Sequence, residues 1–321
     1  MAIASYRRIW GALLFIALCS IGQAGAKPIT LSYNSNALNV TLPIAVAQEM
    51  GYFAAEGLEV TAVYVRSGPT AMTALVSGSS DYTSVGSTMV IQAIAKGVPA
   101  LVIGNYIKQV NYVLIGAKGI AHLNALKGRV VGVTGAGGMT EFTTVESLAR
   151  KGLRRDRDYK IQYSGNSPVR VGALEAGIIQ AAPFSPAERV VLEQKGFPVI
   201  LDMGKVIPEF PMSVLATSRH KAETNPAETT ALLRAFHRAM ELIRSDKDRA
   251  IAAAVKKRVI GDASTERKAL DYIADDYSIV ITKENIQALI TAAGVADEAR
   301  KLGGAEKFST PEMQINAVSR R

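Results

Sequence analysis

The sequence predicts an α/β protein of two lobes, each a mainly parallel sheet flanked by helices, followed by a helical C-terminal block. Strand-like and helix-like segments alternate at short intervals from Pro28 to Asn105. The alternation restarts at Arg129 and runs to Leu201, and from about Asn225 the pattern indicates helices alone. Such alternation is typical of parallel strands joined by covering helices. Because it occurs twice, we expect two similar lobes rather than one large sheet.

The first lobe is expected from three successive strand–helix units and a final strand. Strand patterns cover residues 29–33, 58–65, 81–85 and 100–105. Helical patterns cover residues 42–50 and 89–96. Between them, residues 67–70 open a further helix that ends at residue 76. In the first of these helices, Leu42, Val46 and Met50 recur four residues apart, which places them on one face.

The second lobe repeats this plan before the chain returns to the first. Strands are expected at residues 129–133, 160–163, 180–182 and 199–201, and helices at 139–151, 167–176 and 186–195. A return strand is expected at 213–216. Pro226 suits the first position of a long helix with one apolar face, and further helices are expected at 266–272 and 283–292. This block could pack against lobe one, so we expect that lobe in residues 27–106 and 215–321 and lobe two in 107–214.

The first 26 residues have the three parts of a cleaved export signal. Arg7 and Arg8 precede a 13-residue apolar run, 9–21, and the small residues 23–26 end in an Ala-x-Ala pattern. A membrane-spanning helix needs roughly 20 apolar residues, which disfavours the alternative of an uncleaved anchor. Twin-arginine export is disfavoured by the residues around Arg7-Arg8, and lipidation of Cys19 is disfavoured by Leu18. We therefore expect a periplasmic protein that begins near residue 27.

Removal of this segment would also remove the only cysteine and the only tryptophan, Cys19 and Trp10. The remaining chain would then have no disulfide, thiolate nucleophile or cysteine-ligated metal. The net charge of +9 is dispersed, and its densest cluster, around Arg154 and Arg155, is interleaved with aspartates. A nucleic-acid surface would need a stripe of basic and aromatic residues, and the sequence has none. We expect no cofactor, no metal and no nucleic-acid partner.

Ligands of open parallel sheets bind outside the carboxyl ends of the strands, so the loops there are the candidate site. These loops are 34–36, 67–70 and 86–88 in lobe one, and 134–140, 164–166 and 183–184 in lobe two. Helix starts offer unpaired N–H groups and partial positive charge, which can hold an anion. The candidate ligand-binding residues are Asn34, Ser35, Asn36, Ser67, Gly68, Thr70, Gly86, Ser87, Thr88, Tyr106, Thr134, Gly137, Gly138, Met139, Thr140, Asn166 and Phe184.

Two alternatives stay open for these loops. Gly, Ser, Thr and Asn also serve turns and helix caps, so any single loop is explained by capping as well as by ligand contact. Arg170, on the helix after 164–166, could meet an acidic ligand or simply lie in solvent. The glycine turn at 134–140 lacks the Lys-Ser/Thr of a nucleotide loop and the glycine spacing of a dinucleotide fingerprint.

Five phrases of the sequence stand out: LPIAVAQEMGYF at 42–53, EGLEV at 56–60, ALVSGSSDY at 74–82, ALKGRVVGV at 125–133 and ALEAGIIQAA at 173–182. They resemble phrases of the nitrate/sulfonate/taurine family of solute-binding proteins. The phrases stand in the expected order, and the resemblance covers about residues 29–218. One departure is Gln180, which stands where the family often has Asp.

The resemblance implies a type II periplasmic-binding-protein fold, with crossings between the lobes near 105–111 and 211–215. It implies a monomeric binding protein of an ABC importer that captures a small molecule, anionic or bearing a sulfonate or carboxylate group, and delivers it to a membrane permease and ATPase. Two alternatives share the fold. One is a ligand-sensing subunit. The other is an enzyme related to thiamine-precursor synthesis, which would depend on a cysteine-rich segment that is absent here, and we expect no catalytic residues.

Overall fold

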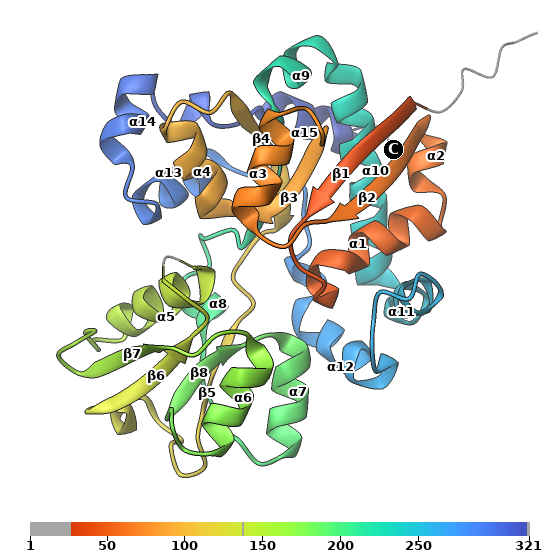
Figure 1. Ribbon diagram of the computed structural model, residues 1–321. Helices are drawn as coiled ribbons and strands as arrows, with labels where there is room; N and C mark the ends of the chain where they lie inside the picture. The colour runs from red at the N-terminus through yellow and green to blue at the C-terminus, as the bar shows by residue number, and fades with distance from the viewer. Residues whose placement is uncertain (1–26, 137, 320–321) are drawn as a thin grey trace, which may run out of the picture.

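Two five-stranded sheets form the centres of the two lobes in the computed structural model, which describes residues 27–136 and 138–319 (Figure 1). The expected export signal lies outside these residues. The first sheet has the order β2-β1-β3-β10-β4, from β1 (Lys27–Tyr33), β2 (Leu58–Tyr64), β3 (Tyr82–Gly86), β4 (Ala100–Ile107) and β10 (Ser213–Ser218). Strands β1, β2 and β3 are parallel, and the return strand β10 is antiparallel to β3 and β4.

The second sheet has the order β7-β6-β8-β5-β9, from β5 (Val113–Gly116), β6 (Arg129–Val133), β7 (Tyr159–Tyr163), β8 (Ala181–Phe184) and β9 (Val199–Asp202). Strand β5 is antiparallel to β8 and β9, and it was not expected from the sequence. Its four residues are all buried, so it lacks the alternation that marks a half-buried strand. The two-lobed α/β architecture is confirmed, with one antiparallel strand inserted in each sheet.

Helices cover both sheets. Lobe one has α1 (Leu38–Glu49), α2 (Tyr52–Ala55), α3 (Gly68–Val76) and α4 (Ser87–Ala95), and lobe two has the 3-10 turn η1 (Leu123–Leu126), α5 (Met139–Arg150), α6 (Ser167–Glu175), α7 (Pro186–Gln194) and α8 (Met203–Val206). Helix α1 begins four residues before its expected start, so Pro43 lies inside it. Residues 38–47 of α1 are all buried, and burial on every side hides the periodicity that marks a helix end.

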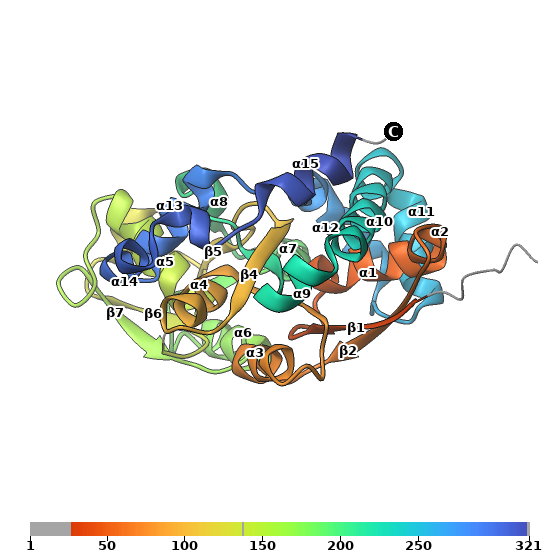
Figure 2. The same ribbon diagram turned by 90° about the horizontal axis from the view of Figure 1, so that it is seen from above.

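The C-terminal block consists of α9 (Arg219–Thr224), α10 (Pro226–Ser245), α11 (Lys247–Lys256), α12 (Ala263–Ile273), η2 (Ala274–Asp276), α13 (Lys283–Ala292), α14 (Ala296–Leu302), η3 (Ala305–Lys307) and α15 (Pro311–Ser319). Most of it packs on lobe one: α10 contacts α1 and α15, and α13 contacts α4 (Figure 2). Phe236 of α10 meets Phe53 and Tyr106 edge to face, with ring centroids 5.3 and 5.5 Å apart. Helix α12 is the exception, because it contacts α7 of lobe two.

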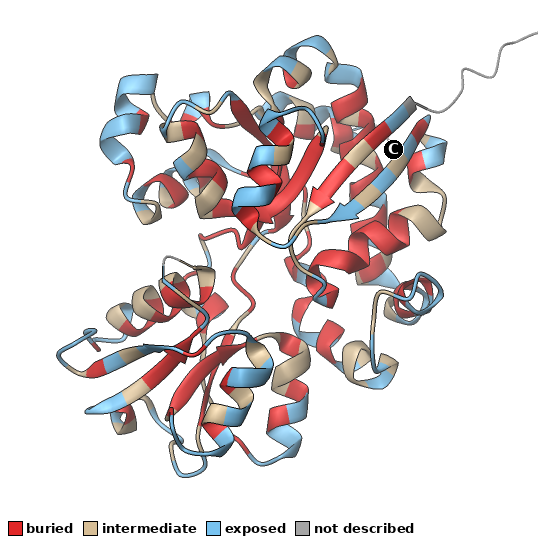
Figure 3. Ribbon diagram, in the orientation of Figure 1, coloured by how far each residue is buried: buried red, intermediate tan, exposed pale blue. Residues whose placement is uncertain are grey.

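Two connections join the lobes, residues 108–112 after β4 and 207–212 before β10. The expected boundary at 106/107 falls at the end of β4, and that at 214/215 falls inside β10. One buried apolar cluster continues from Val102 in lobe one through Val110 to Leu114 in lobe two. The sheet centres and the apolar residues of the connections are therefore buried together, whereas exposed residues lie on the outer helix faces and on the edge strand β2 (Figure 3). Among the described residues, no helix has the length and apolar character needed to span a bilayer.

Candidate functional site

The carboxyl ends of the parallel strands in both lobes face the space between the lobes (Figure 1). A pocket of about 310 Å³ lies there, with Thr88 and Gln92 of α4 on one side and Glu141 and Phe142 of α5 on the other. The start of β10 reaches the same edge of the first sheet, since Ser213 pairs with Gly86. Loop 86–88 of lobe one and the helix that follows loop 134–140 of lobe two therefore line one pocket.

Three of the helices that follow the predicted loops are capped by their own side chains. Ser67 accepts a hydrogen bond from the Thr70 N–H at the start of α3 (3.3 Å), and Asn166 accepts one from the Val169 N–H of α6 (3.4 Å). Helix α7 has a capping box between Ser185 and Glu188. For Ser67, Thr70 and Asn166, helix capping is the role that the geometry assigns.

The other three helices begin without a side-chain cap. The residues before α1, α4 and α5 are Ala37, Gly86 and Gly138, and none supplies a capping hydrogen bond. The first N–H groups of an α-helix have no partner within the helix and carry partial positive charge. At α4 the Ser87 N–H already donates to the Met212 carbonyl (3.3 Å), so the other first-turn N–H groups of these helices are the donors available to a bound anion.

Arg170, in the first turn of α6, is a charged residue that is buried in the second lobe. Its side chain crosses the carboxyl ends of β6, β7 and β8, and the residue is only 4% exposed. One terminal nitrogen, Nη1, donates to Thr134 Oγ1 (2.7 Å) and to the Gly165 carbonyl (2.8 Å), and Nη2 donates to the Pro183 carbonyl (3.4 Å). Of the two alternatives for Arg170, the solvated side chain is wrong, because two loops and the end of β8 fold over it.

The Arg170 guanidinium has no carboxylate ion pair within the described residues, and its Nε has no hydrogen-bond partner. Burial lowers its pKa, and the nearby Glu188 opposes this shift. Tyr112, on the first connection, lies close enough that Arg170 also affects its pKa, which burial raises to about 12. Arginine stays charged in proteins, so this is a buried cation with unused donor capacity beside the interlobe space.

Two aromatic side chains expected at the site lie in the cores instead. Tyr106 is fully buried, and its hydroxyl donates to the Val40 carbonyl (2.6 Å). Phe184 is fully buried beneath Arg170, whose guanidinium carbon lies 5.6 Å from the ring centroid. The burial of Tyr106 and Phe184 is explained by their strands, because all residues of β4 and β8 are buried.

The remaining predicted residues are placed as follows. Ser87 is buried and donates to the Pro211 carbonyl (2.5 Å), Gly68 and Thr140 are buried, and Thr140 accepts from the Thr134 N–H (3.0 Å). Asn34, Ser35, Gly86, Thr88, Gly138 and Met139 are half-buried, whereas Asn36, Thr70, Thr134 and Asn166 are exposed. Gly137 lies outside the described residues. Of the whole set, Thr88 lines the pocket directly.

Sequence reasoning missed three polar side chains that are buried without full pairing near the connections. Asn39, at the start of α1, donates from Nδ2 to Asn111 Oδ1 (3.4 Å), which leaves Asn39 Oδ1 and Asn111 Nδ2 without partners. Ser213 Oγ, at the cleft end of β10, is also unpartnered. Asn39 was hidden because α1 was expected to begin at residue 42.

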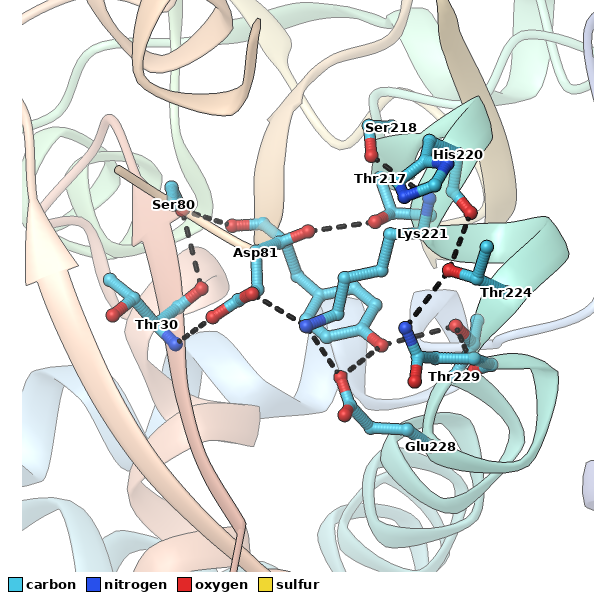
Figure 4. Close-up of polar contacts among 12 residues, drawn as sticks. Thr30, Ser80, Asp81, Thr217, Ser218, His220, Lys221, Thr224, Glu228 and Thr229 are labelled. Carbon is cyan, nitrogen blue, oxygen red and sulfur yellow. Dashed lines mark hydrogen bonds and ion pairs between the residues drawn. The ribbon is translucent and has the colours of Figure 1, made fainter. Parts of the chain in front are cut away.

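A second polar cluster lies at the opposite end of the first sheet (Figure 4). Lys221 Nζ lies 2.5 Å from Asp81 Oδ1 and 2.8 Å from Glu228 Oε1, and the Tyr82 hydroxyl donates to the same Glu228 oxygen (2.9 Å). These contacts tie α9 and α10 to the start of β3, so we interpret the cluster as structural. Within the described residues, no group of three or more His, Cys, Asp or Glu side chains is placed to hold a metal ion.

Comparison with known proteins adds to this geometry. The family model described as "NMT1/THI5 like" matches residues 39–250. The protein YtlA of Bacillus subtilis (strain 168) is 22% identical over 219 residues, which are 67% of this chain and 66% of that protein. The chain thus spans about two thirds of the length of this curated relative.

Solved structures share the fold over nearly the whole chain. The periplasmic aliphatic sulphonate-binding protein SsuA of Escherichia coli has a TM-score of 0.71 at 21% identity, covering 87% of this chain and 94% of that chain. The periplasmic nitrate-binding protein NrtA of Synechocystis PCC 6803 has a TM-score of 0.72 at 15% identity, and the match covers 91% of this chain and 88% of that chain. The two-sheet architecture is thus that of periplasmic binding proteins, and the chain belongs to the NMT1/THI5-like family.

Proposed function

We propose that the chain is the solute-binding protein of an ABC importer and that it binds a small organic or inorganic anion between its lobes. The observation that carries this proposal is Arg170, a buried cation with no carboxylate partner among the described residues. A buried charge is costly unless it is paired. An anion placed against the guanidinium would supply the missing partner, and the uncapped start of α5 would add N–H donors from the same lobe.

The first lobe would complete the site. The uncapped starts of α1 and α4 come from lobe one, and Asn39 and Ser213 there keep polar atoms without partners. A ligand that contacts both lobes stabilises the closed arrangement over the open one, because only the closed form allows all of its contacts. Binding and closure would thus be coupled.

The proposal extends to the setting of the protein. We propose that the chain is exported to the periplasm, acts as a monomer, and passes its ligand unchanged to a membrane permease and its ATPase. The family membership and the structural relatives, which include periplasmic sulphonate- and nitrate-binding proteins, support this reading.

The test begins with native mass spectrometry of gently purified protein comprising residues 27–321, to detect a ligand carried through purification. A thermal-shift screen with nitrate, ethanesulfonate, benzoate and a neutral sugar follows. A ligand at 100 times its dissociation constant stabilises the folded state by about 2.7 kcal/mol, which is readily measured. Stabilisation by an anion, with recovery of that anion unchanged, supports the proposal. Stabilisation by neutral compounds alone, or chemical turnover of the ligand, would refute it.

A further inference from the structure

The two lobes meet at a second place besides their covalent connections. Helix α12 of the C-terminal block packs against α7 of lobe two, and Figure 1 shows the two helices side by side. The guanidinium carbon of Arg189 on α7 lies 4.0 Å from the ring centroid of Tyr272 on α12. Because the rest of the block packs mainly on lobe one, this contact links the two lobes.

One pair of carboxyl groups lies across this contact. Glu266 belongs to α12, and its Oε2 is buried without a hydrogen-bond partner. The pKa of Glu266 is raised to about 7, first by burial and then by the negative charges of Asp262, the N-cap of its own helix, and Glu188 on α7. Glu188 belongs to lobe two, so ionised Glu266 would face a like charge across the lobe boundary.

A second pair lies beside the connections. Asp276, in η2, is 4% exposed, and its Oδ1 accepts from Gln109 Nε2 (2.6 Å) on the first connection. The pKa of Asp276 is raised to about 7. Burial is the largest cause, Asp202 of lobe two and Asp275 act in the same direction, and Gln109 and Lys108 oppose the shift. Asp202 and Asp276 line the same pocket of about 390 Å³.

The neighbouring charged groups are engaged elsewhere. Arg189 pairs with Glu193 on its own helix (3.2 Å), and Lys205, a cation beside the second pair, is exposed and lies 3.7 Å from Asp202 rather than on Asp276. On α12, Asp271 is paired with Lys247 of α11 (2.6 Å) and with Arg267 (3.1 Å), and Arg267 also reaches Asp248 (2.5 Å). Neither Glu266 nor Asp276 forms an ion pair with a cation of the described residues.

We propose that these two cross-lobe carboxyl pairs make the α7–α12 contact a proton-dependent latch between the lobes. With Glu266 and Asp276 protonated, lobe two rests against the C-terminal block as described above. Loss of the two protons places like charges on both sides of the contact and favours arrangements in which the helices separate and the carboxylates reach water. By linkage, a group that holds its proton more tightly in one arrangement makes that arrangement more populated at low pH. The latch therefore weakens as pH rises through about 7.

The experiment measures the distance between the lobes in ligand-free protein. Residues 27–321 contain no cysteine, so Ile178→Cys in lobe two (58% exposed) and Val255→Cys on α11 (50% exposed) provide two sites for spin labels. Distance distributions are recorded by pulsed electron resonance at about pH 5.5 and about pH 8.5, on either side of the expected transition. We expect one short distance at the lower pH and a longer, broader distribution at the higher pH, with a midpoint near 7.

Variants assign the effect to the two acids. Glu266→Gln with Asp276→Asn mimics the protonated forms and is expected to keep the short distance at both pH values. Each single variant is expected to remove part of the change, which keeps the test informative if the double variant folds poorly. Glu284→Gln, on the exposed first turn of α13, serves as the matched control and should behave as wild type. A wild-type distance that does not change with pH, or an unchanged response in the double variant, overturns the proposal. Because no ligand is present, either result is independent of the proposed function.

Discussion

Replacing Arg170 tests the proposed binding site most directly. The change Arg170→Met keeps the length and the apolar stem of the side chain but removes the guanidinium. In the ligand-free protein, Arg170 makes two short hydrogen bonds, to Thr134 and Gly165, and one long one, to Pro183. Their loss is offset by relief of the buried charge, so we expect a stability change within about 2 kcal/mol in either direction.

The effect on binding should be larger. Arg170 has one buried donor, Nε, without any partner, and it can supply at least one charge-assisted hydrogen bond to an anion. Hydrogen bonds to charged groups contribute about 1.5–3 kcal/mol, so the dissociation constant of the anion should rise about 10- to 150-fold. Arg170→Lys keeps the charge but loses the planar fork, and we expect an intermediate loss.

Isothermal calorimetry with the anion identified by the thermal-shift screen measures both variants. Arg129→Met is the matched control, because Arg129 lies exposed at the other end of β6 and should leave the affinity unchanged. If Arg170→Met binds the anion as tightly as wild type while remaining folded, the anion does not sit against this guanidinium and the assignment of the site is wrong.

Three further predictions concern stability. Lys221→Met removes the ammonium that pairs with buried Glu228, so chemical denaturation should show a loss of about 3–5 kcal/mol. Gly204→Ala places a Cβ about 2.1 Å from the Val110 carbonyl oxygen beside the connections, and the backbone shift should cost about 1–3 kcal/mol in the same assay. Asp276→Asn should match wild type in stability near pH 4 and exceed it at pH 8. The folded-state pKa of this acid is raised to about 7, so wild type loses stability as pH rises from about 4 to 7, by up to about 4 kcal/mol.

Each of these has a control within the chain. Lys195→Met removes an exposed pair with Glu175 and should cost less than about 1 kcal/mol. Gly68→Ala would meet the flexible end of Met89 rather than backbone, so the cost should be smaller than at Gly204. Equal losses in Lys221→Met and Lys195→Met would show that the Lys221 cluster is not structural. A pH-independent difference between Asp276→Asn and wild type would show that Asp276 does not change its proton on folding.

The sequence by itself determined the architecture, because its signals are local. The periods of apolar residues distinguish strands from helices within a few residues, and the restart of the pattern near Arg129 is enough to indicate a second lobe. The same periods cannot be recognised where every residue of a segment is buried. The four apolar residues of β5 and the buried first turn of α1 show no alternation with solvent-facing residues, so neither was expected.

Only the tertiary structure decided which polar groups are free to bind. Ser67 and Asn166 have the same chemistry as residues of an anion site, but backbone geometry directs their side chains to their own helices. Arg170 is the reverse case, because its burial depends on three segments far apart in the chain: the loops after β6 and β7, at residues 134 and 165, and strand β8 at residue 183. Composition and periodicity describe neighbours in sequence, whereas desolvation and pairing depend on neighbours in space, and the chain brings those together only when it folds.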